Sequence, residues 1–206
     1  MLPCLRGVAV HDGWSPYWRY QSTTHALCGA HLLRELEGLV DEPGQGWAPG
    51  MAELLVDVKL AGDRARAAGL RQVDDDVRAR LRVRYQRLVT DGQAANPPPA
   101  RGRRRGRARR SPAGRLLARL AIHRDEVLRS LDDTRVPFDN NQAERDLRMV
   151  KLQQKISGCW RTLAGAAAFL AVRSYVATAR KHRMNPLAVL RLLFEGAPWL
   201  PATTGP

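Results

Sequence analysis

Two carboxylates that lie far apart in the sequence have settings in which an acid could do chemistry. Asp12 follows the apolar run 5–10, which predicts a short strand, so this acid stands at the strand's carboxyl end. Glu144 lies on a predicted helix, flanked by Arg145 and Arg148. An acid among cations that face DNA phosphate is repelled by that phosphate unless a bound cation bridges the two. Mg²⁺ bridges groups in this way, so the pair predicts a divalent-metal site.

Each of these acids also has an ordinary interpretation. Asp12 could simply be the turn residue that ends a strand. Glu144 could form an exposed ion pair with Arg148 one helical turn away, which would stabilise the helix by about 0.3–0.5 kcal/mol.

The charge of the chain indicates a polyanionic partner. The 206 residues hold 34 Lys and Arg against 20 Asp and Glu, a net charge of +14. Residues 91–115 contain eight arginines and one acid, and residues 139–183 contain nine basic residues and three acids. This clustering favours nucleic acid, with an anionic lipid surface or plain solubility as alternatives.

The sequence gives no indication of a membrane segment or a disulfide framework. No apolar stretch approaches the roughly 18 residues that a membrane span needs. The three cysteines, at positions 4, 28 and 159, are odd in number and scattered. We therefore expect a reduced, cytoplasmic protein.

The periodicity of apolar residues predicts a mainly helical chain. A strand is expected over 5–12, a short helix after Trp14, and either a strand or a helix start over 23–28. Longer helices are expected over 29–40, 48–69, 73–90, 114–131, 141–155, 162–183 and 186–195, with Asp139 or Asn140 as the N-cap of the 141–155 helix. The helix over 162–183 is apolar almost all round, so we expect it to be buried.

Residues 91–115 form a basic arm of low complexity. Three prolines after Asn96 end the preceding helix, and the Arg/Gly run that follows cannot bury a core, so we expect disorder. The run either follows the DNA backbone or is an insert without function. The DNA-binding interpretation rests on Arg101, Arg103, Arg104 and Arg105.

Three segments resemble the insertion sequence 66 family of bacterial transposases. These are Val-Pro-Phe-Asp-Asn-Asn-Gln-Ala-Glu-Arg-Asp-Leu-Arg at 136–148 with Lys-Ile-Ser-Gly-Cys at 155–159, His-Asp at 11–12 followed by Tyr17, and His-Ala-Leu-Cys-Gly-Ala-His-Leu-Leu-Arg-Glu at 25–35. The Asn-Asn-Gln-Ala-Glu-Arg string is highly specific. The resemblance covers nearly the whole chain outside 91–115.

The resemblance implies an α/β ribonuclease-H-like core whose Asp, Asp, Glu triad holds two Mg²⁺ or Mn²⁺ ions. Asp12 would be the second acid and Glu144 the third. Residues 1–28 would then be a remnant of the core, 29–135 a helical insertion, 136–183 the Glu helix with the next core helix, and 184–206 a C-terminal helix and tail. The implied partner is DNA at the element ends and target in the bacterial nucleoid, and a homo-oligomer on DNA would fit the family.

The first acid of such a triad has no counterpart here, because residues 1–11 contain no Asp or Glu. We therefore expect a transposase core truncated at its N-terminus and inactive by itself. The alternative is a non-catalytic DNA-binding remnant that regulates transposition.

Further residues could contact the metal ions or DNA. Cys28 and His31 have half of a zinc spacing, with His25 and Cys159 as the other ligands, but zinc is the less favoured interpretation. By resemblance His31 would position a phosphate, together with Asn140 and Asn141; a buried structural pair is the rival. On the Glu144 helix the expected DNA contacts are Arg145, Arg148, Lys151 and Lys155. The aromatic residues at 14, 17 and 18 either belong to the core or stack on bases.

Overall fold

The computed structural model describes residues 6–98 and 110–202, without the side chains of Leu147, Val150, Lys151, Gln154 and Ser157. The chain divides into two compact units, Met1–Asn141 and Gln142–Pro206.

The first unit begins with a small parallel sheet. Strand β1 (Gly7–His11) pairs with β2 (Thr23–Leu27), and His11 lies opposite Leu27. The 3-10 helix η1 (Ser15–Arg19) forms part of the connection, with a proline in its first turn. Because the strands are parallel, their carboxyl ends meet at one edge. Segment 23–28, which periodicity left open, is therefore a strand that ends directly before a helix.

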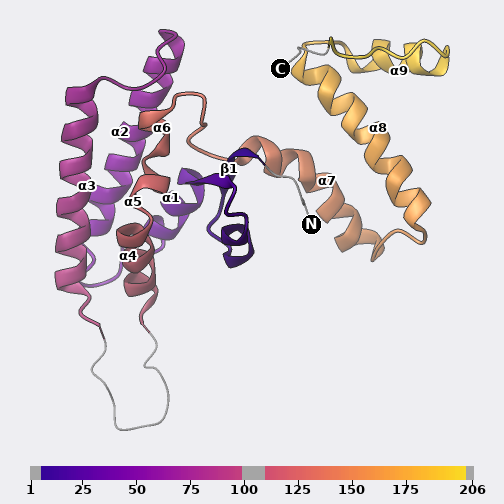
Figure 1. Cartoon of the computed structure of the whole chain (residues 1–206). Helices are drawn as coiled ribbons and strands as arrows, with labels where there is room; N and C mark the ends of the chain where they lie inside the picture. Colours follow the sequence, from indigo (N-terminus) through magenta and orange to yellow (C-terminus); the bar gives the residue numbers. More distant parts are fainter. Residues whose placement is uncertain (1–5, 99–109, 203–206) are drawn as a thin grey trace. The chain divides into compact units, whose positions relative to one another are not determined.

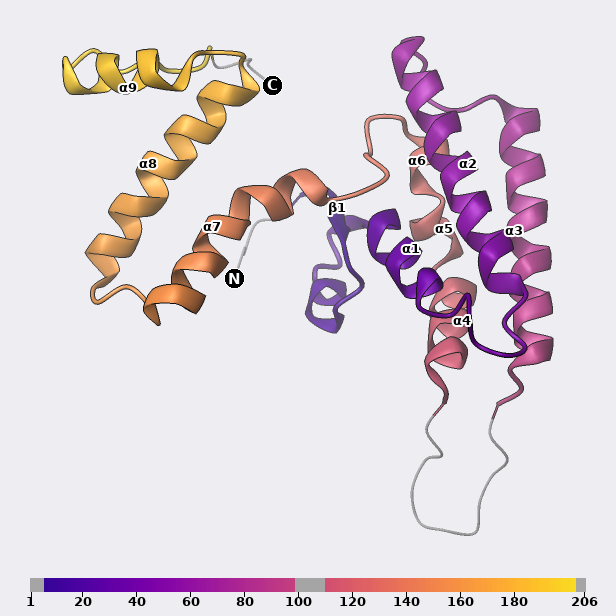
Figure 2. The same ribbon diagram turned by 180° about the vertical axis from the view of Figure 1, so that it is seen from behind.

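Helices make up the rest of the first unit (Figures 1 and 2). They are α1 (Gly29–Glu37), α2 (Trp47–Ala67), α3 (Asp75–Ala95), α4 (Pro112–Ile122), α5 (Arg124–Val127) and α6 (Arg129–Asp132). In both views the two long helices α2 and α3 lie side by side. Both helices contribute to the core of this unit, where Leu54, Leu55, Val58, Tyr85 and Val89 are buried at the three- and four-residue spacing of a helix face.

The single helix expected over 114–131 is broken into three. His123 and Leu128 have non-helical backbone angles and separate α4, α5 and α6. Leu120, Leu128 and Leu131, which are spread over this broken stretch, are all fully buried. Tertiary burial has thus overridden a continuous helical pattern.

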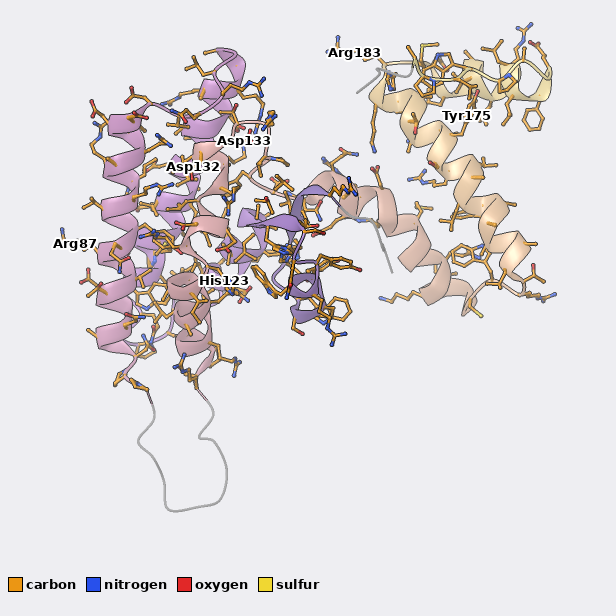
Figure 3. All side chains as sticks on the ribbon, in the orientation of Figure 1. Arg87, His123, Asp132, Asp133, Tyr175 and Arg183 are labelled. Carbon is orange, nitrogen blue, oxygen red and sulfur yellow. The ribbon has the colours of Figure 1, made fainter. Side chains whose placement is uncertain are left out.

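Asp132 joins α6 to α3. Its carboxylate accepts hydrogen bonds from Arg78 at 2.9 Å and from Arg82 at 2.6 Å. Figure 3 shows Asp132 within the bundle and Arg87 projecting from the outer face of α3. The basic residues of α3 are therefore divided between internal ion pairs and the solvent.

The second unit contains α8 (Leu163–Lys181), α9 (Pro186–Phe194) and all but the first residue of α7 (Asn141–Ser157). The Tyr175 hydroxyl, labelled in Figure 3, donates to the Val189 carbonyl and accepts from the Trp199 amide, both at 3.0 Å. This phenol ties α8 to α9 and to the C-terminal tail.

The expectation that the 162–183 helix is buried is wrong. It forms as α8, but Ala179 is its one buried residue within the described part of the chain, and Leu163 is 91% exposed. The second unit is too small to enclose an apolar helix on every side, since folded chains of this size leave much of their surface in water.

The basic arm is shorter than expected. Helix α3 continues to Ala95 and α4 begins at Pro112, so both ends of the 91–115 segment are helical. Arg101, Arg103, Arg104 and Arg105 lie outside the described residues. Among the described residues, no helix has the length and apolar character needed to cross a membrane.

Candidate metal and DNA site

Asp12 lies in a tight turn immediately after β1. Its Oδ1 accepts the Trp14 backbone N–H at 2.9 Å, and Gly13 adopts a φ of +89° that favours glycine. The Asp12 side chain is exposed. The turn therefore orients one carboxylate oxygen by a hydrogen bond and presents the group to solvent at the carboxyl edge of the sheet.

A chain of hydrogen bonds through two histidines holds this turn in place. The Gly13 N–H donates to His11 Nδ1 at 3.0 Å, so the proton of His11 is on Nε2. Nε2 then donates to His25 Nδ1 at 3.1 Å, and His25 Nε2 donates to the Tyr20 carbonyl at 3.2 Å. Both rings are fully satisfied in their neutral forms.

Burial of His11 disfavours its charged form. The residue is 3% exposed, and its ring packs on Tyr17 and Trp18. Loss of solvation, followed by the neighbouring His25, lowers the pKa of His11 to about 4, although Asp12 acts in the opposite direction. His11 is therefore a neutral acceptor for the turn at physiological pH.

The start of α7 is fastened to the same edge of the sheet. The Cys28 N–H donates to the His11 carbonyl at 2.8 Å, and the Asn140 N–H donates to Cys28 Sγ at 3.3 Å. Asp139 Oδ1 accepts the Asn141 N–H at 3.0 Å, so the Asp139 side chain binds the N–H of the first residue of α7. The first unit thus brings together Asp12, Cys28, His31, Asn140 and Asn141.

The zinc interpretation loses one of its ligands in this arrangement. The ligand in question is His25, because both of its ring nitrogens are engaged in hydrogen bonds. Cys28 is buried, and its sulfur accepts a backbone N–H. His31 lies in the first turn of α1, where its N–H donates to the Cys28 carbonyl at 3.1 Å.

The aromatic residues near Asp12 divide between the core and the surface. Trp18 packs against the core and stacks on His123 with ring centroids 4.2 Å apart. Trp14 is 64% exposed and Tyr17 is 37% exposed. The core interpretation therefore holds for Trp18 alone.

Glu144 and the cations expected to bind DNA lie in the second unit. Arg145, Arg148 and Lys155 are exposed along α7, whereas the side chain of Lys151 lies outside the described residues. Asp146, the other acid of α7, accepts a hydrogen bond from Lys181 of α8 at 2.6 Å, and this contact lowers the pKa of its carboxyl. Its charge is therefore matched within the unit.

The two units differ in net charge. Outside 99–109, the first unit holds 18 basic residues and 17 acids, whereas the second holds ten basic residues and three acids. The described part of the first unit is thus nearly neutral. Apart from 99–109, the positive charge of the chain is concentrated in α7, α8 and the segments that follow.

Asp12 and Glu144 each carry oxygen donors of the kind that a hard cation takes. Asp12 offers an exposed carboxylate already oriented by the Trp14 N–H, and Glu144 offers a second carboxylate from the first turn of α7. Mg²⁺ and Mn²⁺ take oxygen ligands of this type. Each of these two acids, taken by itself, therefore offers the kind of oxygen ligand that such an ion takes.

Sequence reasoning missed several residues that position this site. His11 and His25 hold the turn that carries Asp12. The one local sign of this role in the sequence is that His11 directly precedes Asp12. Arg66, more than 60 residues away, donates to the carbonyls of Thr134 and Val136 on the approach to α7. Nothing local in the sequence indicates that contact.

Comparisons with known proteins agree with the pattern of these residues. The family model described as Transposase IS66 family matches residues 1–168, which include Asp12, Cys28, His31 and the α7 segment with Glu144. Neither the comparison with curated proteins nor that with solved structures gives a match. The match spans well over half of the chain, and we conclude that this protein belongs to the IS66 family of transposases.

Proposed function

We propose that this transposase chain supplies two carboxylates, Asp12 and Glu144, to a divalent-metal centre for phosphoryl transfer on DNA, within a ribonuclease-H-like core. One observation carries the proposal: the Cys28 N–H bonds to His11, and the Asn140 N–H bonds to Cys28 Sγ. These contacts hold the start of α7 at the sheet edge that presents Asp12.

Helix geometry supports the pairing of the two acids. Asn141 is the first residue of α7, and Glu144 follows it by three residues. At a rise of about 1.5 Å per residue, Glu144 lies about 4.5 Å further along the helix axis. A carboxylate in this first turn is also favoured by the positive end of the helix dipole.

Each chain group has a defined role in this proposal. Asp12 and Glu144 hold Mg²⁺ or Mn²⁺, which when bound activates the attacking hydroxyl and stabilises the leaving oxygen. His31, Asn140 and Asn141 position the scissile phosphate. His11 orients the Asp12 turn through the Gly13 N–H.

The DNA partner is supported by the unequal charge of the units. Arg145, Arg148 and Lys155 share one face of α7 at helical spacing, and Asp146, the acid among them, is paired with Lys181. We propose that this face follows the phosphate backbone next to the reacting strand.

Two carboxylates carry too little negative charge to hold the two divalent cations of a two-metal centre. We therefore propose that the 206 residues bind DNA without cleaving it by themselves. A non-catalytic DNA-binding role in regulating transposition is the second candidate, favoured by the ten basic residues against three acids in the second unit.

Manganese titration tests the metal site. Mn²⁺ binding, followed by electron paramagnetic resonance, is compared for the wild type, Asp12→Asn and Glu144→Gln. Asp41→Asn and Glu37→Gln, which change exposed acids elsewhere in the first unit, serve as matched controls. We expect each site variant to bind at least about tenfold more weakly and each control to match the wild type. Equal affinity in all five proteins would refute the assignment.

A nicking assay tests whether the chain cleaves DNA by itself. Supercoiled plasmid is incubated with the chain and Mn²⁺, and the nicked form is quantified. We expect no nicking above background. Nicking that disappears in Glu144→Gln would show that the chain is catalytic by itself and would end the non-catalytic alternative. Binding of DNA together with metal affinity that ignores Asp12 and Glu144 would favour that alternative.

A further inference from the structure

Residues 133–140, the segment between α6 and α7, make contacts with the rest of the first unit at several points. Its Thr134 N–H donates to the Arg71 carbonyl at 3.0 Å, and the Thr134 hydroxyl donates to the Leu70 carbonyl at 2.5 Å. Val136 is 3% exposed and Phe138 is 8% exposed. This segment runs directly into α7, so its position determines where that helix begins.

One side chain from a distant helix binds two carbonyls of this segment. Arg66, near the end of α2, donates from Nε to the Thr134 carbonyl at 2.7 Å and from Nη2 to the Val136 carbonyl at 3.2 Å. Its Nη1 donates to Asp63 at 2.9 Å. The guanidinium is therefore held between a carboxylate of its own helix and two carbonyls of the segment.

The geometry requires a guanidinium. Three nitrogens of one planar group reach three acceptors, and the two bonds to the segment fix both its distance and its orientation. A lysine ammonium could charge-pair with Asp63 or bind one carbonyl, but it lacks the planar fork that spans residues 134 and 136. Both bonds are partly buried, so water replaces a lost donor only in part.

Beyond these bonds, the segment reaches the carboxyl edge of the sheet. The Gly29 N–H donates to the Phe138 carbonyl at 2.8 Å, and the Asn140 N–H donates to Cys28 Sγ. Arg66 therefore holds the middle of a segment whose far end meets the strand end beside Asp12.

We propose that Arg66 is a positioning residue that sets where α7 starts, next to the strand end that carries Asp12. This inference rests on the proposed metal-binding function. Arg66 itself touches neither metal nor DNA. It acts through the backbone of 134–136. Through this contact, helix α2 helps to hold the segment that leads to the proposed metal site.

Two measurements on four proteins test this inference. The wild type is compared with Arg66→Met, which keeps the apolar stem without donors, with Arg66→Lys, and with the control Arg64→Met on the exposed side of the same helix. Amide hydrogen exchange of peptides that span 133–141 reports how firmly the segment is held. Mn²⁺ affinity reports the metal site, and thermal unfolding shows that each variant is folded.

We expect exchange in 133–141 to be about tenfold faster in Arg66→Met, because two charge-assisted bonds are lost. Mn²⁺ binding should weaken by about tenfold, as it does when groups behind metal ligands are removed. Arg66→Lys should fall between the wild type and Arg66→Met, and Arg64→Met should match the wild type in both measurements.

The outcomes separate this inference from the proposed function. If Mn²⁺ binding depends on Asp12 and Glu144 but is unchanged in Arg66→Met, the positioning role is wrong and the function stands. If binding depends on neither acid, the function is wrong. Hydrogen exchange needs no metal, so unchanged exchange in Arg66→Met overturns the inference in either case.

Discussion

The ring of Phe138 fills the space that a side chain on Gly29 would need. A Cβ on Gly29 would lie 2.1 Å from Phe138 Cζ, and the Gly29 N–H donates to the Phe138 carbonyl at 2.8 Å. Gly29, which begins α1 just after the end of β2, is thus in tight contact with the segment before α7. The contact leaves no room for a side chain at position 29.

Gly29→Ala should destabilise the chain by about 1–3 kcal/mol, because the added methyl overpacks the ring of Phe138. Urea denaturation measures the change. Gly46→Ala is the control, since nothing lies within 4 Å of a Cβ at that position, and it should stay within about 0.5 kcal/mol of the wild type. Phe138→Leu combined with Gly29→Ala should recover part of the loss. A Gly29→Ala protein as stable as Gly46→Ala would contradict the observed packing.

His11 should make the chain less stable in mild acid. Its pKa is about 4 in the folded protein and about 6.5 in the unfolded chain, so the unfolded chain takes up the proton first as the pH falls. The stabilisation is complete above about pH 6.5 and is lost as the pH falls through about 4, to an extent of up to about 3 kcal/mol.

Unfolding free energies at pH 7 and pH 4.5 test the His11 prediction. His11→Asn keeps an acceptor for the Gly13 N–H but does not titrate, so its loss between these pH values should be smaller than that of the wild type. His182→Asn, in the second unit, should lose as much as the wild type. Equal losses in all three proteins would mean that His11 is not responsible.

The buried phenol of Tyr85 should contribute about 1–2 kcal/mol through a single hydrogen bond. Its hydroxyl donates to the Leu120 carbonyl at 2.9 Å and so joins α3 to α4, and burial raises the pKa of this phenol. Tyr85→Phe keeps the ring but leaves the carbonyl without that donor. Chemical denaturation is the measurement. Tyr17→Phe, at a partly exposed position, should be nearly neutral, and equal effects at the two positions would be inconsistent with the structure.

DNA affinity should depend on salt mainly through the second unit. Replacement of Arg145, Arg148 and Lys155 by alanine should reduce the slope of log affinity against log salt by about one unit for each lost phosphate contact. The control replaces Arg64, Arg80 and Arg87, exposed residues of α2 and α3, and should leave the slope nearly unchanged. Fluorescence anisotropy of a labelled duplex over a range of salt concentrations measures both. A larger change in the control would place the DNA on the first unit instead.

Local sequence was sufficient to predict most helices and to single out the two candidate acids. The recurrence of apolar residues every three or four positions predicted α1, α2, α3, α7, α8 and α9 close to their observed bounds. Asp12 and Glu144 stood out because a strand end and a basic helix are visible in short stretches of sequence. The family followed from the strings around these acids.

The tertiary structure alone decided how these parts meet. The parallel pairing of β1 with β2, the breaks at His123 and Leu128, and the exposure of α8 all depend on which surfaces find a partner. Arg66 is the clearest example, because its acceptors are backbone carbonyls 68 and 70 positions away. Every residue type has a backbone carbonyl, so the identities of residues 134 and 136 do not matter for this contact. The contact therefore leaves no pattern in the sequence. Helical periodicity is a short-range property that a window of residues contains, whereas the position of residues 134–136 depends on long-range contacts that appear only when the chain has folded.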